Sequence, residues 1–137
     1  MGKFVAEAAI KNMIAVGQAP KYSNVVILGL TFKENCPDIR NSKVNDIVIT
    51  LNSYGIEPLV VDPWANKDDA MHEYGITLTS LEDVKNVDCV IVAVAHDEFK
   101  KLSLNEIKKM FKMVIMPLLM VRFNTMDLVM NLIKVML

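Results

Sequence analysis

The chain has 137 residues, which is enough for one domain with a hydrophobic core and too few for two. Its 15 basic and 16 acidic residues give a formal net charge of -1. This balance lacks the charge surplus of proteins that bind nucleic acids or membrane surfaces. We therefore expect a small ligand or a protein partner.

The cysteine pattern and the apolar tracts indicate a cytoplasmic protein. Cys36 and Cys89 are far apart and lack CxxC spacing, which argues against a disulfide framework and a structural zinc site. The most apolar tract, residues 113–121, contains a proline and is much shorter than the ~20 residues that span a bilayer. The N-terminal segment has no secretory signal pattern. We expect no membrane segment.

The chain begins with a predicted helix and a predicted buried strand. Apolar residues at helical spacing from Val5 to Ile14 predict a helix that stops near Gly17. The run NVVILGL, residues 24–30, is almost continuously apolar and rich in β-branched side chains. Such a run is typical of a strand that is buried on both faces of a parallel sheet.

A second helix and a second strand follow in the same order. Apolar spacing predicts a helix over residues 44–51, with Asn41 or Ser42 as its N-cap. The segment EPLVVDP predicts a short strand that ends at Asp62, and residues 66–75 predict a short helix closed by a glycine.

The remaining pattern continues this alternation. Residues 76–80 predict an edge strand, and VDCVIVAVAH, residues 87–96, predicts a second strongly buried strand. Ser103 and Glu106 are spaced as a capping box for another helix, and residues 113–119 predict a last strand. Strands that alternate with helices in this way indicate a doubly wound, three-layer α/β sandwich with a mainly parallel sheet, preceded by one helix.

The C-terminal segment, residues 121–137, has an atypical, Met-rich composition. Its apolar residues from Met126 to Leu137 keep a helical spacing, which predicts a terminal amphipathic helix. An altered reading frame is the alternative explanation for this composition.

The polar loop after the first strand is the candidate functional segment. It is about ten residues long, where ~2 to 6 residues are usual, and ligands of parallel sheets bind at the carboxyl ends of strands. Lys33 and Arg40 can form charge-assisted hydrogen bonds to phosphate or carboxylate groups. The alternative is that Asp38 and Arg40 only brace the loop, with Pro37 stiffening it. No GxGxxG motif is present, so the loop is not a pyrophosphate-binding turn.

Three motifs of the chain, GLTFKENCPDIRNSKV, VDPWA and VIVAVAHDEF, resemble the C-terminal domain of the UDP-glucose/GDP-mannose dehydrogenase family. The first motif is most similar to that of bacterial UDP-N-acetylhexosamine 6-dehydrogenases. The resemblance runs from about residue 1 to residue 112. It implies that residues 20–120 form a Rossmann-like UDP-sugar-binding domain and that residues 1–19 are the end of the central helix through which the family dimerises.

The resemblance also implies roles for individual residues. Phe32 and Lys33 match the family positions that hold the UDP-sugar, and Arg40 matches the arginine that reaches the NAD cofactor across the interdomain cleft. A lysine can neutralise a phosphate and a guanidinium can bind one with two hydrogen bonds, so the residue types fit. Asp38 would orient Arg40. Arg122 is the nearest candidate for the basic residue that follows the family's last strand, and we assign it no role.

Cys36 invites comparison with the cysteine nucleophile of the family, but we reject that role. The nucleophile of the family lies in a glycine-containing Cys-Ile-Pro segment upstream of the central helix, and this chain has no such segment. No histidine adjoins Cys36 to activate its thiol. We expect Cys36 to be a packed loop thiol and Cys89 to be a core residue, and we assign no catalytic residue and no metal ligand.

Four further residues admit both a functional and a structural interpretation. His96 ends a buried strand, where it is placed to act as an acid or base, to cap a helix or to pin the loop, and we favour the structural roles. Asp62 fits either a ribose-binding acid or a turn former. Trp64 fits either a cover for apolar surface or a contact with a neighbouring domain, and we expect His72 to be solvated.

The sequence therefore predicts the nucleotide-sugar-binding lobe of an NAD-dependent UDP-sugar 6-dehydrogenase. Its family oxidises an alcohol to a carboxylate by two hydride transfers. The expected partners are a UDP-sugar, a missing N-terminal NAD-binding domain and a second copy of the chain. We expect this chain alone to be inactive. The alternative is a non-catalytic α/β module for oligomerisation or interaction.

Overall fold

The computed structural model describes residues 2–15, 17, 19–21, 23–110 and 118–120. The predictions for the Met-rich segment 121–137, including Arg122, lie outside these ranges.

A four-stranded parallel sheet forms the centre of the fold, in the order β2-β1-β3-β4. The strands are β1 (Val25–Leu28), β2 (Leu59–Val61), β3 (Cys89–Val92) and β4 (Leu118–Met120). β1 pairs with a strand on each side, as its apolar composition predicts. The central strand therefore delivers the polar loop to the middle of the sheet edge.

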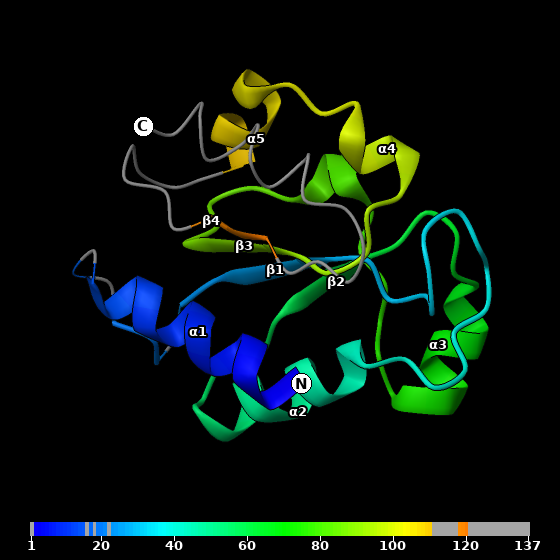
Figure 1. Ribbon diagram of the computed structural model, residues 1–137, viewed down its shortest axis with the longest axis horizontal. Helices are drawn as coiled ribbons and strands as arrows, with labels where there is room; N and C mark the ends of the chain where they lie inside the picture. Colours follow the sequence, from blue (N-terminus) through cyan, green and yellow to red (C-terminus); the bar gives the residue numbers. More distant parts are fainter. Residues whose placement is uncertain (1, 16, 18, 22, 111–117, 121–137) are drawn as a thin grey trace.

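Helices cover both faces of this sheet (Figure 1). α1 (Gly2–Ala15) and α2 (Val44–Ser53) lie on one face, and the short helices α4 (Asp97–Lys100) and α5 (Leu104–Met110) lie on the other. α3 (Lys67–Tyr74) lies beside the loop that follows β1. This arrangement confirms the predicted three-layer α/β sandwich that is preceded by one helix.

The alternation of side chains along the strands divides the core in two. One cluster joins α1 and α2 to the strand residues Val25, Ile27, Cys89 and Ile91. The other joins Phe99, Ile107 and Met110 to Val26, Leu28, Val90 and Val92. Burial raises the pKa of the Cys89 thiol to about 12, so this cysteine is a core residue, as predicted.

The helix ends agree with most of the capping predictions. Ser103 and Glu106 form the predicted capping box, in which the Ser103 N–H donates to Glu106 Oε2 at 2.8 Å and the Glu106 N–H donates to Ser103 Oγ at 3.2 Å. The N-cap of α2 is Lys43, so the prediction of Asn41 or Ser42 as the N-cap was wrong. Ser42 still serves the helix start, because its hydroxyl accepts the N–H of Val44.

Three further differences concern short segments. Residues 76–80 form no strand, since only one bridge pairs Leu78 with Val60 of β2. The sequence did not predict α4, which has four residues and too little periodicity to detect. The predicted last strand, residues 113–119, overlaps β4 only at its end, and residues 113–117 lie outside the described ranges.

Within the described ranges, no helix has the length and hydrophobicity required to traverse a bilayer.

Candidate functional site

The strand connections change from one face of the sheet to the other between β1 and β3. The connection after β1 runs through α2 on one face of the sheet, and the connection after β3 runs through α4 and α5 on the opposite face. Adjacent strands whose connections leave in opposite directions open a crevice at their carboxyl ends, where ligands of such folds bind. The predicted loop borders this crevice.

Gly29 allows the chain to enter the crevice. Its φ angle is +107°, in a region that L side chains rarely adopt. A Cβ atom at this position would lie 2.5 Å from Val94 Cβ and 2.7 Å from the Val94 backbone nitrogen. Only glycine therefore lets the segment after β1 pass so close to the segment after β3.

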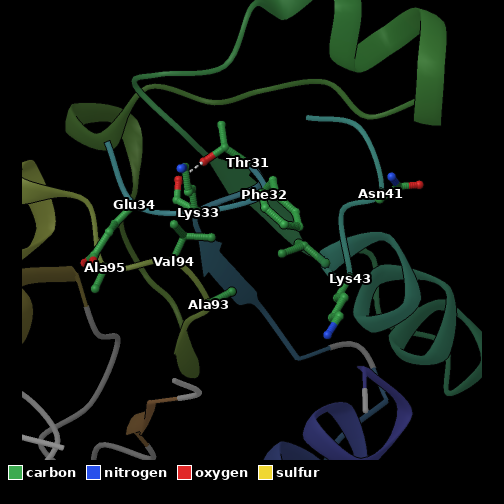
Figure 2. Close-up of a pocket in the computed structure, with 10 residues that line it drawn as sticks. Thr31, Phe32, Lys33, Glu34, Asn41, Lys43, Ala93, Val94 and Ala95 are labelled. Atoms are coloured by element: carbon green, nitrogen blue, oxygen red, sulfur yellow. Dashed lines mark hydrogen bonds between the residues drawn. The ribbon is translucent and has the colours of Figure 1, made fainter. Parts of the chain in front are cut away.

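A pocket of about 450 Å³ occupies the crevice (Figure 2). Its lining comes from the segment after β1 (Thr31, Phe32, Lys33 and Glu34), from the start of α2 (Asn41, Lys43 and Val44) and from the segment after β3 (Ala93, Val94 and Ala95). Two lysines against one glutamate make the lining cationic. The pocket therefore combines a small apolar wall with a preference for anions.

Phe32 and Lys33, the predicted substrate-binding residues, both line this pocket. Phe32 is 59% exposed, which is unusual for a phenylalanine and leaves its ring available for stacking or apolar contact. Lys33 is exposed, and no ion pair within the described residues engages it. The Thr31 hydroxyl donates to the Lys33 carbonyl at 3.0 Å and holds the segment in a tight turn (Figure 2).

Arg40, the predicted cofactor-binding residue, does not line the pocket and extends into solvent with 82% of its side chain exposed. Its Nε donates to Asp38 Oδ1 at 3.0 Å and its Nη2 donates to Asp38 Oδ2 at 2.9 Å. The hydrogen bond from Arg40 lowers the pKa of Asp38 to about 2. The aspartate thus orients the arginine, as predicted, and no other acceptor in the described part of the chain contacts the guanidinium.

Asp62 is buried and does not line the pocket, so the ribose-binding interpretation was wrong, whereas its bonds to the N–H groups two and three residues on confirm the turn-forming interpretation. Its Oδ2 accepts the backbone N–H groups of Leu30 at 2.6 Å and Thr31 at 3.0 Å, and its Oδ1 accepts those of Trp64 at 2.8 Å and Ala65 at 3.2 Å. Burial raises the pKa of this carboxyl, but hydrogen bonds from His96, Leu30 and Thr31 outweigh burial and lower it. Asp62 is therefore an ionised structural acceptor.

His96 is completely buried and pins the loop, which confirms the favoured structural interpretation. Its Nδ1 accepts the backbone N–H of Asn35 at 2.9 Å, so this nitrogen carries no proton. Its Nε2 then carries the proton and points at Asp62 Oδ2, 3.0 Å away, and at Thr31 Oγ1, 3.1 Å away. The partners thus fix one neutral tautomer of the ring.

Aromatic rings enclose the histidine on two sides. Trp64 stacks on it with a centroid distance of 6.1 Å and an interplanar angle of 23°, and Phe99 lies at 5.6 Å with a tilt of 54°. Trp64 Nε1 also donates to Glu98 at 2.9 Å. Trp64 therefore covers one face of the His96 ring, and its predicted contact with a neighbouring domain stays a prediction.

Sequence reasoning missed the joint role of Asp62, His96 and Asn35. Asn35 donates its backbone N–H to His96, and its side-chain oxygen accepts the N–H of Asp97 at the start of α4. The signal was present, because Asp62 and His96 each follow a strand next to β1. Carboxyl ends of neighbouring parallel strands meet at one sheet edge.

The other candidate residues lie apart from this constellation. Cys36 is half-buried in the loop, and His72 is exposed on α3, as predicted for both. The described residues hold no group of three or more His, Cys, Asp or Glu side chains that would bind a metal ion.

Two solved structures that superpose on this chain are sugar-nucleotide dehydrogenases. A UDP-D-ManNAc dehydrogenase from Pyrococcus horikoshii superposes with a TM-score of 0.69 at 23% identity, over 85% of this chain and 26% of that chain. An NDP-N-acetyl-D-galactosaminuronic acid dehydrogenase from Methanosarcina mazei gives a TM-score of 0.71 at 21% identity, over 80% of this chain and 22% of that chain. At these identities the similarity establishes the Rossmann-like fold alone.

Sequence comparison establishes the family. The chain is 46% identical over 112 residues to a UDP-N-acetyl-D-glucosamine 6-dehydrogenase of Pseudomonas aeruginosa, covering 82% of this chain and 26% of that protein. A Salmonella typhi protein of the same name is 43% identical, covering 79% of this chain and 25% of its own length. The chain thus spans about a quarter of these relatives. Because residues 26–121 also match the UDP-binding domain of the UDP-glucose/GDP-mannose dehydrogenases, the chain belongs to the UDP-glucose/GDP-mannose dehydrogenase family.

Proposed function

We propose that the chain binds the UDP moiety of a UDP-sugar in the pocket between β1 and β3. The observation that carries the proposal is that Phe32 and Lys33 line one cationic pocket at the topological switch point, inside the segment that matches the family's UDP-binding domain. Lys33 would neutralise a phosphate, and Phe32 would supply an apolar contact. The names of the relatives support a UDP-N-acetylhexosamine as the sugar nucleotide.

Within a longer NAD-dependent UDP-sugar 6-dehydrogenase, this lobe would bind and orient substrate. The chemistry that NAD would supply in such an enzyme is hydride acceptance, and oxidation of an alcohol to a carboxylate would consume two NAD+ molecules, one for each hydride, and one water for the second carboxylate oxygen. The exposed guanidinium of Arg40 fits a phosphate of this cofactor, because its ion pair uses two of five N–H donors and it does not line the pocket. We propose that none of the described residues serves as the nucleophile and that the chain alone does not turn over.

Binding of UDP tests the proposal directly. Isothermal titration calorimetry of the chain should show UDP binding that Lys33→Ala weakens roughly tenfold or more, because a hydrogen bond to a charged group contributes about 1.5 to 3 kcal/mol. Lys85→Ala is the matched control, because Lys85 is exposed and precedes β3 at the opposite edge of the sheet. A response to GDP without a response to UDP, or equal affinities for both lysine variants, would contradict this function.

We also propose that α1 pairs with α1 of a second copy, as the dimer expected from the sequence requires. Phe4 is 74% exposed and Ile14 is 59% exposed on this helix. A partner helix that covers both side chains would remove this apolar surface from water. Cytoplasmic location stays a prediction from the sequence.

Sedimentation velocity tests the dimer. The unaltered chain should sediment as a dimer and Phe4→Glu as a monomer, whereas Met71→Glu, which places the same charge on exposed α3, should leave the dimer intact. A monomeric unaltered chain would exclude the dimer. A dimer that binds no UDP would favour the alternative, a non-catalytic interaction module.

A further inference from the structure

The segment that carries Phe32 and Lys33 is held at both ends by one buried pair of side chains. At its start, Asp62 Oδ2 accepts the N–H groups of Leu30 and Thr31. At its end, His96 Nδ1 accepts the N–H of Asn35. Asp62 and His96 also contact each other at 3.0 Å, so the two anchor points form one unit.

The anchoring unit has no contact with solvent. The side chains of Asp62 and His96 are both 0% exposed, and Thr31 is buried beside them. Each of these buried polar groups therefore depends on the others for its hydrogen bonds. Phe32 and Lys33, by contrast, are exposed and line the pocket on the far side of the same short segment.

The histidine performs two separable tasks. Its Nε2 contacts the carboxylate at the start of the segment, and its Nδ1 contacts the Asn35 amide at the end. Asn35 adopts a φ of 54°, in the left-handed region that asparagine tolerates better than most residues, and its side chain accepts the N–H of Asp97. Loss of the Nδ1 contact would leave the Asn35 N–H without its acceptor in a strained turn.

We propose that His96 is a positioning residue of the ligand site, which fixes Phe32 and Lys33 by holding the Asn35 amide through Nδ1 while Asp62 anchors Nε2. The inference rests on the proposed binding of UDP by this pocket. His96 itself touches no ligand, and its effect on affinity comes through the backbone of residues 31–35.

Two substitutions separate the two nitrogens. The side-chain oxygen of asparagine falls near the Nδ1 position of histidine, so His96→Asn keeps an acceptor for the Asn35 amide and loses the donor to Asp62. The amide nitrogen of glutamine reaches the Nε2 position of histidine. His96→Gln therefore keeps the donor to the Asp62 carboxylate and loses the acceptor for the Asn35 N–H. Both variants remove the ring between Trp64 and Phe99, which makes them a matched pair.

The expected result is a crossed pattern between affinity and stability. UDP affinity, measured by calorimetry on the full chain, should stay within about threefold of the unaltered protein in His96→Asn and fall roughly tenfold in His96→Gln, the size of one lost hydrogen bond. Thermal stability should instead be higher in His96→Gln, since this variant keeps the donor to the buried carboxylate. His72→Asn and His72→Gln, at the exposed histidine, should change neither. Equal affinity of the two His96 variants would overturn the inference.

Hydrogen exchange of the Asn35 amide provides a readout without ligand. This amide should exchange roughly tenfold faster in His96→Gln than in His96→Asn, because only the asparagine offers an acceptor. If the unaltered chain binds no UDP, the proposed function fails and the exchange ratio alone decides the inference. Equal exchange in the two variants would then overturn it as well.

Discussion

Substitution of Gly29 by alanine is expected to lower the free energy of unfolding by about 2 to 5 kcal/mol, as the sum of overpacking and backbone strain. The new Cβ would lie 2.5 Å from Val94 Cβ and 2.7 Å from the Val94 backbone nitrogen. The segment after β1 and the segment after β3 would have to separate to relieve these contacts. We therefore expect a loss of stability together with a distorted pocket.

Gly75→Ala provides the matched control for this prediction. Gly75 also has a positive φ, 68°, but a Cβ there would meet nothing within 4 Å. Its replacement should lower the unfolding free energy by only about 1 kcal/mol, from backbone strain alone. Urea unfolding followed by far-UV circular dichroism measures both variants, and similar losses for the two glycines would refute the steric argument.

Replacement of Asp62 by asparagine is the second change with a large expected effect, a loss of about 3 kcal/mol or more of unfolding free energy at neutral pH. One carboxylate oxygen accepts the N–H groups of Leu30 and Thr31 and the other accepts those of Trp64 and Ala65. An asparagine turns an NH2 group toward one of these pairs of donors. At least two N–H groups, fully or partly buried, then lose their acceptor.

The stabilisation that Asp62 provides depends on pH in a direction that follows from its pKa. The pKa of Asp62 in the folded chain lies below its ordinary value of about 3.9, so the ionised carboxylate stabilises the fold at all pH values above that figure. This contribution is lost as the pH falls through the folded-state pKa. The stability gap between the unaltered protein and Asp62→Asn should therefore be widest near neutral pH and narrow in acid.

Chemical denaturation at several pH values between neutral and about 3 tests the Asp62 prediction, since the stability that the carboxylate contributes starts to fall once the pH drops below the ordinary pKa of about 3.9. Asp83→Asn, which alters an exposed carboxylate in a short 3-10 helix, is the control and should leave the unfolding free energy nearly unchanged. A gap for Asp62→Asn that stays constant down to the acid limit would show that the charge of Asp62 contributes nothing.

The sequence was sufficient to predict the layers of the fold and the edge of the sheet at which the candidate site lies. Continuous β-branched runs at β1 and β3 identify strands that are buried on both faces, and parallel strands bring their carboxyl ends to one edge. The position of Phe32 and Lys33 beside a pocket follows from that geometry. Segments at the edge of the sheet were harder to predict from the sequence. Residues 76–80 show strand-like alternation, but in the structure they make only one bridge.

The support behind the pocket could not be predicted from local patterns. His96 lies 34 positions from Asp62 and 61 positions from Asn35, so no periodicity or capping rule connects them. The sequence does not show whether a carboxylate is buried or exposed, so it left both the ribose-binding and the turn-forming interpretation of Asp62 open. Tertiary structure decides between these roles, because only the folded chain shows which donors reach the oxygens.

The ion pair between Asp38 and Arg40 has an entropic consequence. A long arginine side chain in solvent normally loses rotamer freedom when it captures an anion, and this loss weakens binding. Two hydrogen bonds to a neighbouring residue already restrict the side chain here, so much of the loss occurs when the protein folds. The loop therefore presents a preorganised guanidinium to solvent. An anionic group that binds Arg40 would restrict few further rotamers, so the entropy cost of binding is small.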